Sequence, residues 1–125
     1  MSIIVDSSVW IDYFRGGKYS NQLDLYIEQN IISTNDLILA ELIPILKIKR
    51  EFPVISLLRN ITLIPLVINW ENIINYQTKC LKHGINKVGI PDLIILDNVI
   101  QNDLTLYSLD KHFKLINNHI DFELL

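Results

Sequence analysis

The chain has 125 residues, half of them hydrophobic and a fifth charged, and its formal net charge is −3. This length fits one core, so we expect residues 1–125 to form a single domain, and the composition excludes an intrinsically disordered segment. The net negative charge argues against a protein that coats nucleic acid through positive charge alone.

No segment resembles a membrane span or a secretory signal. The longest apolar stretches, residues 37–46 and 61–68, are too short to cross a bilayer, and an N-terminus without a basic region meets an acid at Asp6. Cys80 is the only cysteine, which rules out an intramolecular disulfide and favours a reducing, cytoplasmic location. A free cysteine on a helix is more often structural than catalytic.

The first half of the chain predicts helices alternating with short strands. In chain order we expect a buried strand over residues 2–5, a helix capped by Ser7 or Ser8 and running to Phe14, a helix over 21–29, a very short strand over 31–32, a helix over 36–49 and a helix over 51–60. Residues 33–35 offer capping side chains for the helix over 36–49. Pro44 should kink or divide that helix, because proline cannot donate a backbone hydrogen bond.

The second half continues the alternation. We expect a strand over 61–64, a helix over 70–83, a helix from Pro91 to 101, a strand over 105–108, a helix over 110–116 and a strand over 122–124. Proline is favoured in the first turn of a helix, as at Pro91. Apolar strands that alternate with helices indicate an α/β fold, with a parallel sheet covered on both faces.

Acidic residues lie at the ends of predicted elements. Asp6 ends the first strand, and Asp110 follows the strand over 105–108. Ligands of open α/β sheets gather at the carboxyl ends of the strands, so parallel strands would bring both carboxylates to one edge. Asp92 lies in the first turn of its helix, where the helix dipole favours a negative charge.

Glu41 is the only charged residue in the stretch 37–46, which looks like a helix that is apolar on almost every side. A buried ionised carboxylate is costly unless it is paired or binds a metal. No Lys or Arg lies three or four residues away along the helix, so we expect the partner of Glu41 to come from elsewhere in the fold.

Our candidate catalytic and metal-binding residues are therefore Asp6, Glu41, Asp92 and Asp110. Carboxylates without His or Cys at ligand spacing suit a hard cation such as Mg²⁺ or Mn²⁺. Such an ion can orient a phosphodiester, activate a water and stabilise the leaving oxygen, so the set predicts a nuclease. Ser8, two residues after Asp6, could support a carboxylate or a metal-bound water.

The acids lie in segments with recognisable patterns, namely residues 5–16 (VDSSVWIDYFRG), 39–42 (LAEL), 89–95 (GIPDLII) and 106–113 (LYSLDKHF). In order and spacing these segments resemble PIN-domain nucleases of the VapC toxin type, and the similarity covers the whole chain. The sequence departs from the family's pattern around Asp97, where the family often has a small residue.

The resemblance implies a three-layer α/β/α PIN-like fold with a central, mainly parallel five-stranded sheet. It implies a Mg²⁺- or Mn²⁺-dependent endoribonuclease that acts on RNA as a toxin, forms a homodimer and is inhibited by a cognate antitoxin. It also implies that the four acids named above form the metal site, with Ser8 assisting.

Other polar residues have simpler interpretations. Asp97 lies about 140° around its helix from Asp92 and should point away from the site. We expect Asp12 and Asp103 to be solvated or capping residues, and the histidines, His83, His112 and His119, to have surface or capping roles. Seven basic residues have two interpretations, a solvated surface, which is the commoner one, and contact with RNA phosphates. They are Arg15, Lys18, Lys47, Lys49, Arg50, Lys111 and Lys114.

Two other classes of protein remain open. A non-catalytic PIN-like scaffold that binds only a protein partner would be marked by loss of one or more acids, and here all four are present. A phosphoryl-accepting receiver domain would need an Asp at the end of the middle strand, and residues 61–68 offer none. The aromatic residues of the first helices belong to the core or, in part, to a dimer or antitoxin contact; they are Trp10, Tyr13, Phe14 and Tyr26.

Overall fold

A computed structural model describes residues 2–125, and Met1, the first residue of the predicted domain, lies outside the described residues. In chain order the elements are β1 (Ile3–Val5), α1 (Ser7–Phe14), α2 (Ser20–Glu28), β2 (Ile32–Thr34), α3 (Asp36–Ile48), α4 (Phe52–Arg59), β3 (Thr62–Leu63), α5 (Trp70–Lys82), α6 (Ile90–Gln101), β4 (Thr105–Tyr107), α7 (Lys111–Asn117) and β5 (Glu123–Leu124). No helix in residues 2–125 has the length and hydrophobicity needed to cross a bilayer.

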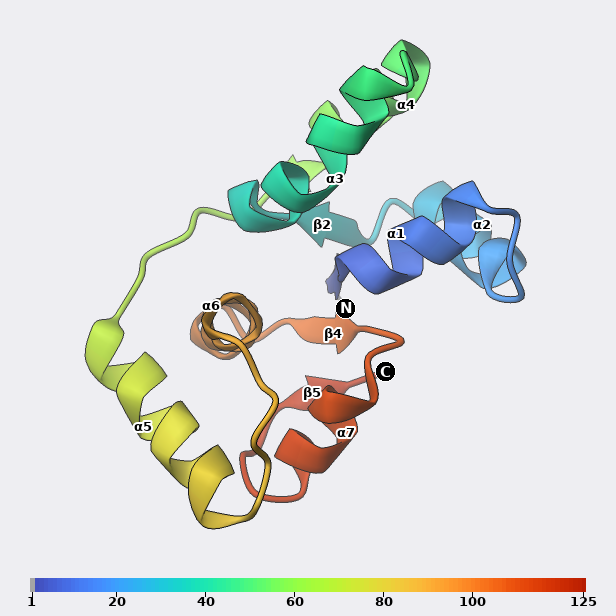
Figure 1. The fold of residues 1–125 in the computed structure, drawn as a ribbon. Helices are drawn as coiled ribbons and strands as arrows, with labels where there is room; N and C mark the ends of the chain where they lie inside the picture. Colours follow the sequence, from blue (N-terminus) through green and yellow to red (C-terminus); the bar gives the residue numbers. More distant parts are fainter. Residues whose placement is uncertain (1) are drawn as a thin grey trace.

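The strands form one five-stranded sheet in the order β3-β2-β1-β4-β5, and each neighbouring pair is parallel. Figure 1 shows the helices arranged around this sheet, so the predicted α/β class and three-layer architecture are confirmed. The central strand β1 is fully buried, as expected for a parallel strand covered on both faces. Trp10 of α1 is equally buried and stacks on Phe14, with ring centroids 5.9 Å apart.

The register of β1 against β4 decides which residues meet at the carboxyl edge of the sheet. Val5 pairs with Tyr107, and the backbone N–H of Asp6 donates to the Tyr107 carbonyl oxygen at 2.9 Å. Asp6 and Ser108, the residues that follow, therefore leave the sheet side by side. On the other side of β1, strand β2 leads through Asn35 into α3.

The prediction for the second strand was wrong. Strand β2 spans Ile32–Thr34 rather than 31–32, and Ser33 and Thr34 are buried within it. Capping of α3 therefore falls to Asn35 alone, whose side chain accepts a hydrogen bond from the backbone N–H of Ile38 at 2.9 Å. The apolar pattern identified the strand, but the β-sheet extends it into polar residues because their backbone groups pair with β1 and β3.

Two further local expectations need correction. Pro44 does not divide α3, which runs unbroken over Asp36–Ile48. Because Pro44 has no backbone N–H, the Ala40 carbonyl lacks its usual helical donor. Both residues are exposed, so water can satisfy that carbonyl. Helix α1 begins at Ser7, and neither Ser7 nor Ser8 is its N-cap; the cap position is Asp6, which makes no side-chain capping bond.

A buried amide pair joins the start of α3 to α6. The Nδ2 of Asn35 donates to Oδ1 of Asn98 at 3.0 Å, and the Nδ2 of Asn98 donates to the carbonyl oxygen of Pro65 at 3.0 Å. Asn35 is completely buried, and Asn98 is 3% exposed. Because α3 carries Glu41 and α6 carries Asp92, this pair helps to set how the two helices stand relative to each other.

Asp97 points toward α5, as the helical geometry predicts. Its Oδ1 accepts hydrogen bonds from Asn72 Nδ2 at 3.1 Å and from the hydroxyl of Tyr76 at 3.2 Å, and its Oδ2 accepts from Gln101 Nε2 at 2.6 Å. Asp97 is only 2% exposed. A buried carboxylate with three neutral donors therefore ties α5 to α6.

We expect Asp97→Asn to lower the pKa of Tyr76 part of the way from about 12 toward its ordinary value of 10, because burial, the largest cause of the shift, persists while the Asp97 charge is lost. The pKa of Tyr76 is raised in the folded protein. Its contribution to stability is therefore present below pH 10 and is lost as the pH rises to about 12.

Ultraviolet titration of tyrosine absorbance, with Tyr76→Phe to identify the Tyr76 component, measures this shift. An unchanged titration curve in Asp97→Asn would contradict the assignment.

Candidate active site

Asp6 is held by two serine hydroxyls from opposite ends of the chain. Its Oδ2 accepts hydrogen bonds from Ser8 Oγ at 2.9 Å and from Ser108 Oγ at 2.8 Å. The carboxylate is 5% exposed. Within residues 2–125 its Oδ1 accepts no hydrogen bond from protein, so one carboxylate oxygen is fixed while the other remains available to a ligand.

Ser108 is a site residue that the sequence reasoning missed. Its Oγ also accepts from the backbone N–H of Asp110 at 3.0 Å, while Ser8 Oγ accepts from the backbone N–H of Leu109 at 3.0 Å. The two hydroxyls thus tie the segment after β4 to Asp6. The sequence does show a serine at the end of this strand. Its contact with Asp6 could be predicted only if the pairing of β1 with β4 and its register were known.

Asp110 lies at the N-cap of α7, beside His112. Its Oδ1 accepts from the backbone N–H of His112 at 2.9 Å and lies 2.8 Å from the imidazole Nδ1. Within residues 2–125 no Lys or Arg forms an ion pair with an acid, and this contact is an ion pair only when the imidazole is protonated. The sequence reasoning treated His112 as a surface or capping residue, whereas its ring contacts a candidate site carboxylate.

The pKa of the Asp92 carboxyl, in the first turn of α6, is affected by neighbouring acids. Burial raises its pKa, and the negative charges of Asp110 and Asp6 raise it further. A backbone hydrogen bond from Gly89 and the charge of His112 act in the opposite direction. Asp92 thus lies close enough to two other acids for their charges to affect its protonation.

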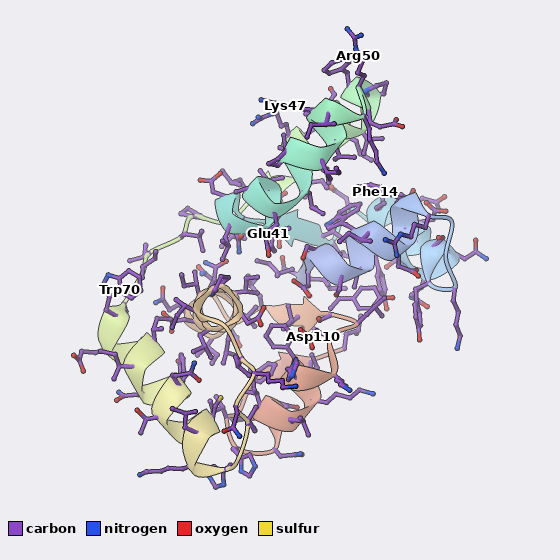
Figure 2. All side chains as sticks on the ribbon, in the orientation of Figure 1. Phe14, Glu41, Lys47, Arg50, Trp70 and Asp110 are labelled. Atoms are coloured by element: carbon purple, nitrogen blue, oxygen red, sulfur yellow. The ribbon has the colours of Figure 1, made fainter. Side chains whose placement is uncertain are left out.

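Glu41 joins the same group from a different layer of the fold. Burial raises the pKa of its carboxyl, followed by the charges of Asp6 and Asp92. Figure 2 shows Glu41 below α3, on the side toward α6 and Asp110. The four predicted acids, which come from four separate segments, are thus connected in pairs: the charges of Asp6 and Asp92 act on Glu41, and those of Asp110 and Asp6 act on Asp92.

The reasoning that singled out Glu41 was nevertheless partly wrong. Helix α3 is not apolar and buried on every side, and Glu41 lies on an exposed stripe with Ala40, Pro44 and Ile45. Two turns of apolar sequence indicated a buried helix, but α3 packs on α1 and α4 and leaves one face open. We expected its partner to come from elsewhere in the fold, but no Lys or Arg in residues 2–125 forms an ion pair with Glu41.

The donor set fits a hard divalent cation. It consists of carboxylate oxygens, and no Lys or Arg ion pair neutralises any of them within residues 2–125. No group of three His, Cys, Asp or Glu side chains in this part of the chain is drawn tightly enough to hold an ion as it stands. Repulsion between like charges keeps such carboxylates apart, and a cation would relieve it.

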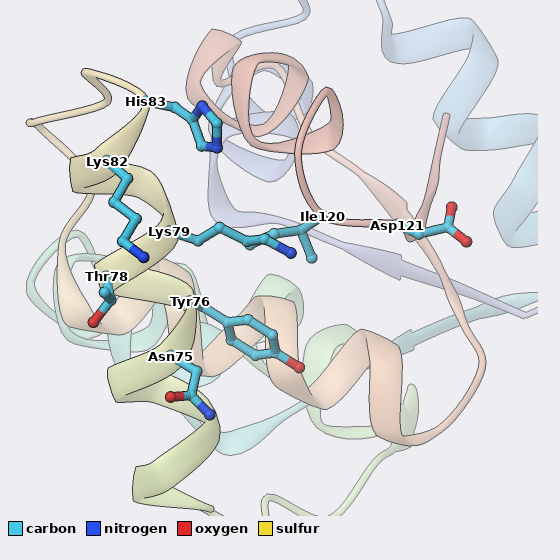
Figure 3. Close-up of a pocket in the computed structure, with 8 residues that line it drawn as sticks. All are labelled: Asn75, Tyr76, Thr78, Lys79, Lys82, His83, Ile120 and Asp121. Atoms are coloured by element: carbon cyan, nitrogen blue, oxygen red, sulfur yellow. The ribbon is translucent and has the colours of Figure 1, made fainter.

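Not every cavity of the molecule adjoins these acids. One of about 550 Å³ lies between α5 and the segment after α7, lined by Tyr76, Lys79, Lys82, His83 and Asp121 among others (Figure 3). None of the four candidate acids lines it. The rings of His83 and His119 also stack nearby, 3.7 Å between centroids, a contact that the sequence did not indicate.

Comparison with known proteins identifies a family. The sequence matches the PIN domain family over residues 3–118. A search of curated protein sequences finds no match.

The fold is similar to several solved structures. A chain of VapBC2 from Rickettsia felis, bound to a DNA fragment from their promoter, aligns with a TM-score of 0.77 and 21% identity over 100% of this chain and 98% of that chain. A chain of DNA-bound VapBC from Salmonella typhimurium gives 0.75 and 12%, over 100% and 97%. VapC20 of Mycobacterium tuberculosis, described as a sarcin-ricin loop cleaving toxin, gives 0.65 and 14%, over 91% and 94%.

We expect Glu41→Gln and Asp92→Asn to raise the melting temperature of the metal-free protein at neutral pH. Both carboxyls have raised pKa values when folded, so just above their ordinary values of 4.5 and 3.8 the folded chain binds more protons than the unfolded chain. Stability therefore falls as pH rises through this interval, and a neutral amide avoids that loss. After allowance for solvent screening the gain is about 0.5–1 kcal/mol, or roughly 2–4 °C.

Calorimetry in the presence of a chelator measures the effect, with Glu123→Gln, an exposed acid of β5, as the control. The gain should be smaller for Asp92→Asn, because an acid in the first turn also stabilises α6 through the helix dipole. A markedly lower melting temperature in both site variants would count against clustering of the acids.

Proposed function

The chain belongs to the PIN domain family, and from this membership we propose that it is a metal-dependent endoribonuclease that acts as the toxin of a toxin–antitoxin pair. The proposal names Mg²⁺ or Mn²⁺ as the cofactor and RNA as the substrate. It includes a homodimeric state and a cytoplasmic location, as the resemblance and the single cysteine led us to expect. Similarity of fold to VapBC chains is consistent with the toxin role.

One observation carries the proposal: the pKa values of Glu41 and Asp92 are raised by burial and by the charges of other candidate acids, and no Lys or Arg in residues 2–125 forms an ion pair with any of these acids. A fold rarely concentrates unpaired negative charge without a cationic ligand, because the repulsion lowers stability. The anionic phosphodiester of RNA is the substrate class that a carboxylate-bound metal handles best.

In the proposed mechanism, Asp6, Glu41, Asp92 and Asp110 would hold the metal. When bound, the ion supplies charge neutralisation and a more acidic water for attack on phosphorus. Ser8 and Ser108 fix one oxygen of Asp6, which orients the other oxygen as a ligand.

His112 has a comparable supporting position. Its imidazole Nδ1 lies 2.8 Å from Asp110 Oδ1, so the ring restrains that carboxylate.

We further propose that an apolar segment of the antitoxin binds in a groove over α1, α3 and α4. A cavity of about 530 Å³ there is lined by Ile11, Tyr13, Phe14, Arg15, Ile45, Leu46, Lys49, Glu51 and Val54. The apolar floor suits a partner helix or strand, and the cations at its edge suit partner carboxylates. Ile45 is one helical turn from Glu41, so a segment in this groove would lie next to the acids.

Purified protein supplied with Mg²⁺ or Mn²⁺ is expected to cleave RNA, and Asp6→Asn or Asp92→Asn should reduce the rate by on the order of a hundredfold or more, because each removes a charged metal ligand. Gel analysis of single-stranded RNA measures cleavage, and circular dichroism verifies that the variants fold. Addition of a chelator should stop the wild type.

Asp103→Asn is the matched control, because Asp103 is an exposed acid after α6 with a positive φ of 51°, which asparagine tolerates. Undiminished cleavage by the site variants would defeat the assignment. A wild type that binds no divalent metal by calorimetry would favour a non-catalytic scaffold instead.

Ile45→Glu should abolish co-purification with the cognate antitoxin, because it places a charge in the groove. Ile45 is 49% exposed, so the change should not disturb the core. Ile74→Glu, on α5 and 54% exposed, is the matched control. Equal capture of the partner by both variants would locate the antitoxin elsewhere.

A further inference from the structure

A small cavity adjoins the candidate active site at Asp110. It measures about 230 Å³ and is lined by Tyr19, Tyr107, Ser108, Leu109, Asp110, Lys111, Lys114 and Leu125. Two of these residues connect it to the acids: Asp110 is itself a candidate ligand, and Ser108 donates to Asp6. A group bound in this cavity would therefore be a direct neighbour of whatever the acids hold.

The charges of this cavity favour an anion. Lys111 and Lys114 line it, and no carboxylate in residues 2–125 forms an ion pair with either of them. The Asp110 carboxylate, the nearest acid along the chain, is engaged by His112 instead. Two ammonium groups without an ion pair outnumber the single side-chain carboxylate of Asp110 in this cavity, and they suit the phosphates of a nucleic-acid strand.

Tyr19 supplies a flat apolar surface at the edge of the same cavity. Its side chain is 38% exposed although its backbone is held in place, since its N–H donates to Asp12 Oδ2 at 3.2 Å. The ammonium of Lys18 lies 5.6 Å from the centre of the ring. An exposed tyrosine ring on an anchored backbone offers a face on which a base can stack.

We propose that this cavity binds the RNA nucleotide next to the cleaved phosphodiester, with its base stacked on Tyr19 and a phosphate held by Lys111 and Lys114. The inference rests on the proposed nuclease function and adds a subsite to it. Stacking recognises every base through its π-face, so the subsite contributes affinity and alignment with little base specificity. Tyr19 is thus a substrate-binding residue and takes no part in metal binding.

Binding can be separated from cleavage in the Asp92→Asn background. Fluorescence anisotropy with a labelled single-stranded oligoribonucleotide should give a Kd about tenfold weaker for Tyr19→Ala. Tyr19→Phe retains the ring and should stay within about twofold of the parent. Trp70→Ala, which removes an aromatic residue that is 58% exposed at the start of α5, should leave the Kd unchanged.

The lysines are tested by the salt dependence of the same Kd. Lys111→Ala and Lys114→Ala should each lower the slope of log Kd against log salt by about 0.7, the loss of one phosphate contact to a single strand. Lys79→Ala, in the separate cavity between α5 and the segment after α7, should leave the slope unchanged.

Equal binding by Tyr19→Ala and its parent, equal weakening by the alanine and phenylalanine variants, or no RNA binding at all would each overturn the subsite. Wild-type protein that binds RNA with the expected Tyr19 dependence but does not cleave it with Mg²⁺ or Mn²⁺ would defeat the proposed nuclease function and support the subsite. If Tyr19→Ala changes neither the rate of cleavage nor the Kd, the subsite is overturned and the proposed nuclease function stands.

Discussion

The parallel alignment of β1 with β4 is the constraint on which the candidate site depends. It places Asp6 beside Ser108, and the two residues form a hydrogen bond of 2.8 Å at the carboxyl edge of the sheet. The Ser8 hydroxyl reinforces the contact from α1. A shift of the register by one residue would send these side chains to the opposite face of the sheet and dissolve the arrangement.

Other carboxylates lie near Asp6, and the repulsion between their negative charges lowers the stability of the fold. Asp92 and Glu41 both have raised pKa values, because partial desolvation and the charges of other carboxylates disfavour their ionised forms. The helices that carry them are linked through the buried Asn35–Asn98 pair, so the repulsion cannot simply spread the helices apart. A protein in this condition is poised to gain stability from a divalent cation, because binding replaces repulsion by attraction.

The surface around the acids divides into two regions of different character. Toward α7 lie unpaired lysines and Tyr19, which suit a polyanionic strand with exposed bases. Toward α1 and α4 lies the apolar groove of which Ile45 forms part. This division reconciles a net charge of −3 with the proposed RNA substrate, because the local charges near the acids matter more than the net charge of the chain.

The sequence by itself determined the fold class, the order of the elements and the four acids as candidates. Apolar runs that alternate with helical patterns dictate a covered parallel sheet, and an acid at the end of such a strand must lie at its carboxyl edge. Contacts between distant segments were decided by the tertiary structure alone. Ser108 against Asp6 and Tyr19 beside the α7 lysines depend on strand register and loop path, which no local pattern encodes. The exposure of Glu41 likewise depends on which faces of α3 its neighbours cover, and periodicity cannot reveal that when apolar residues occur on every side.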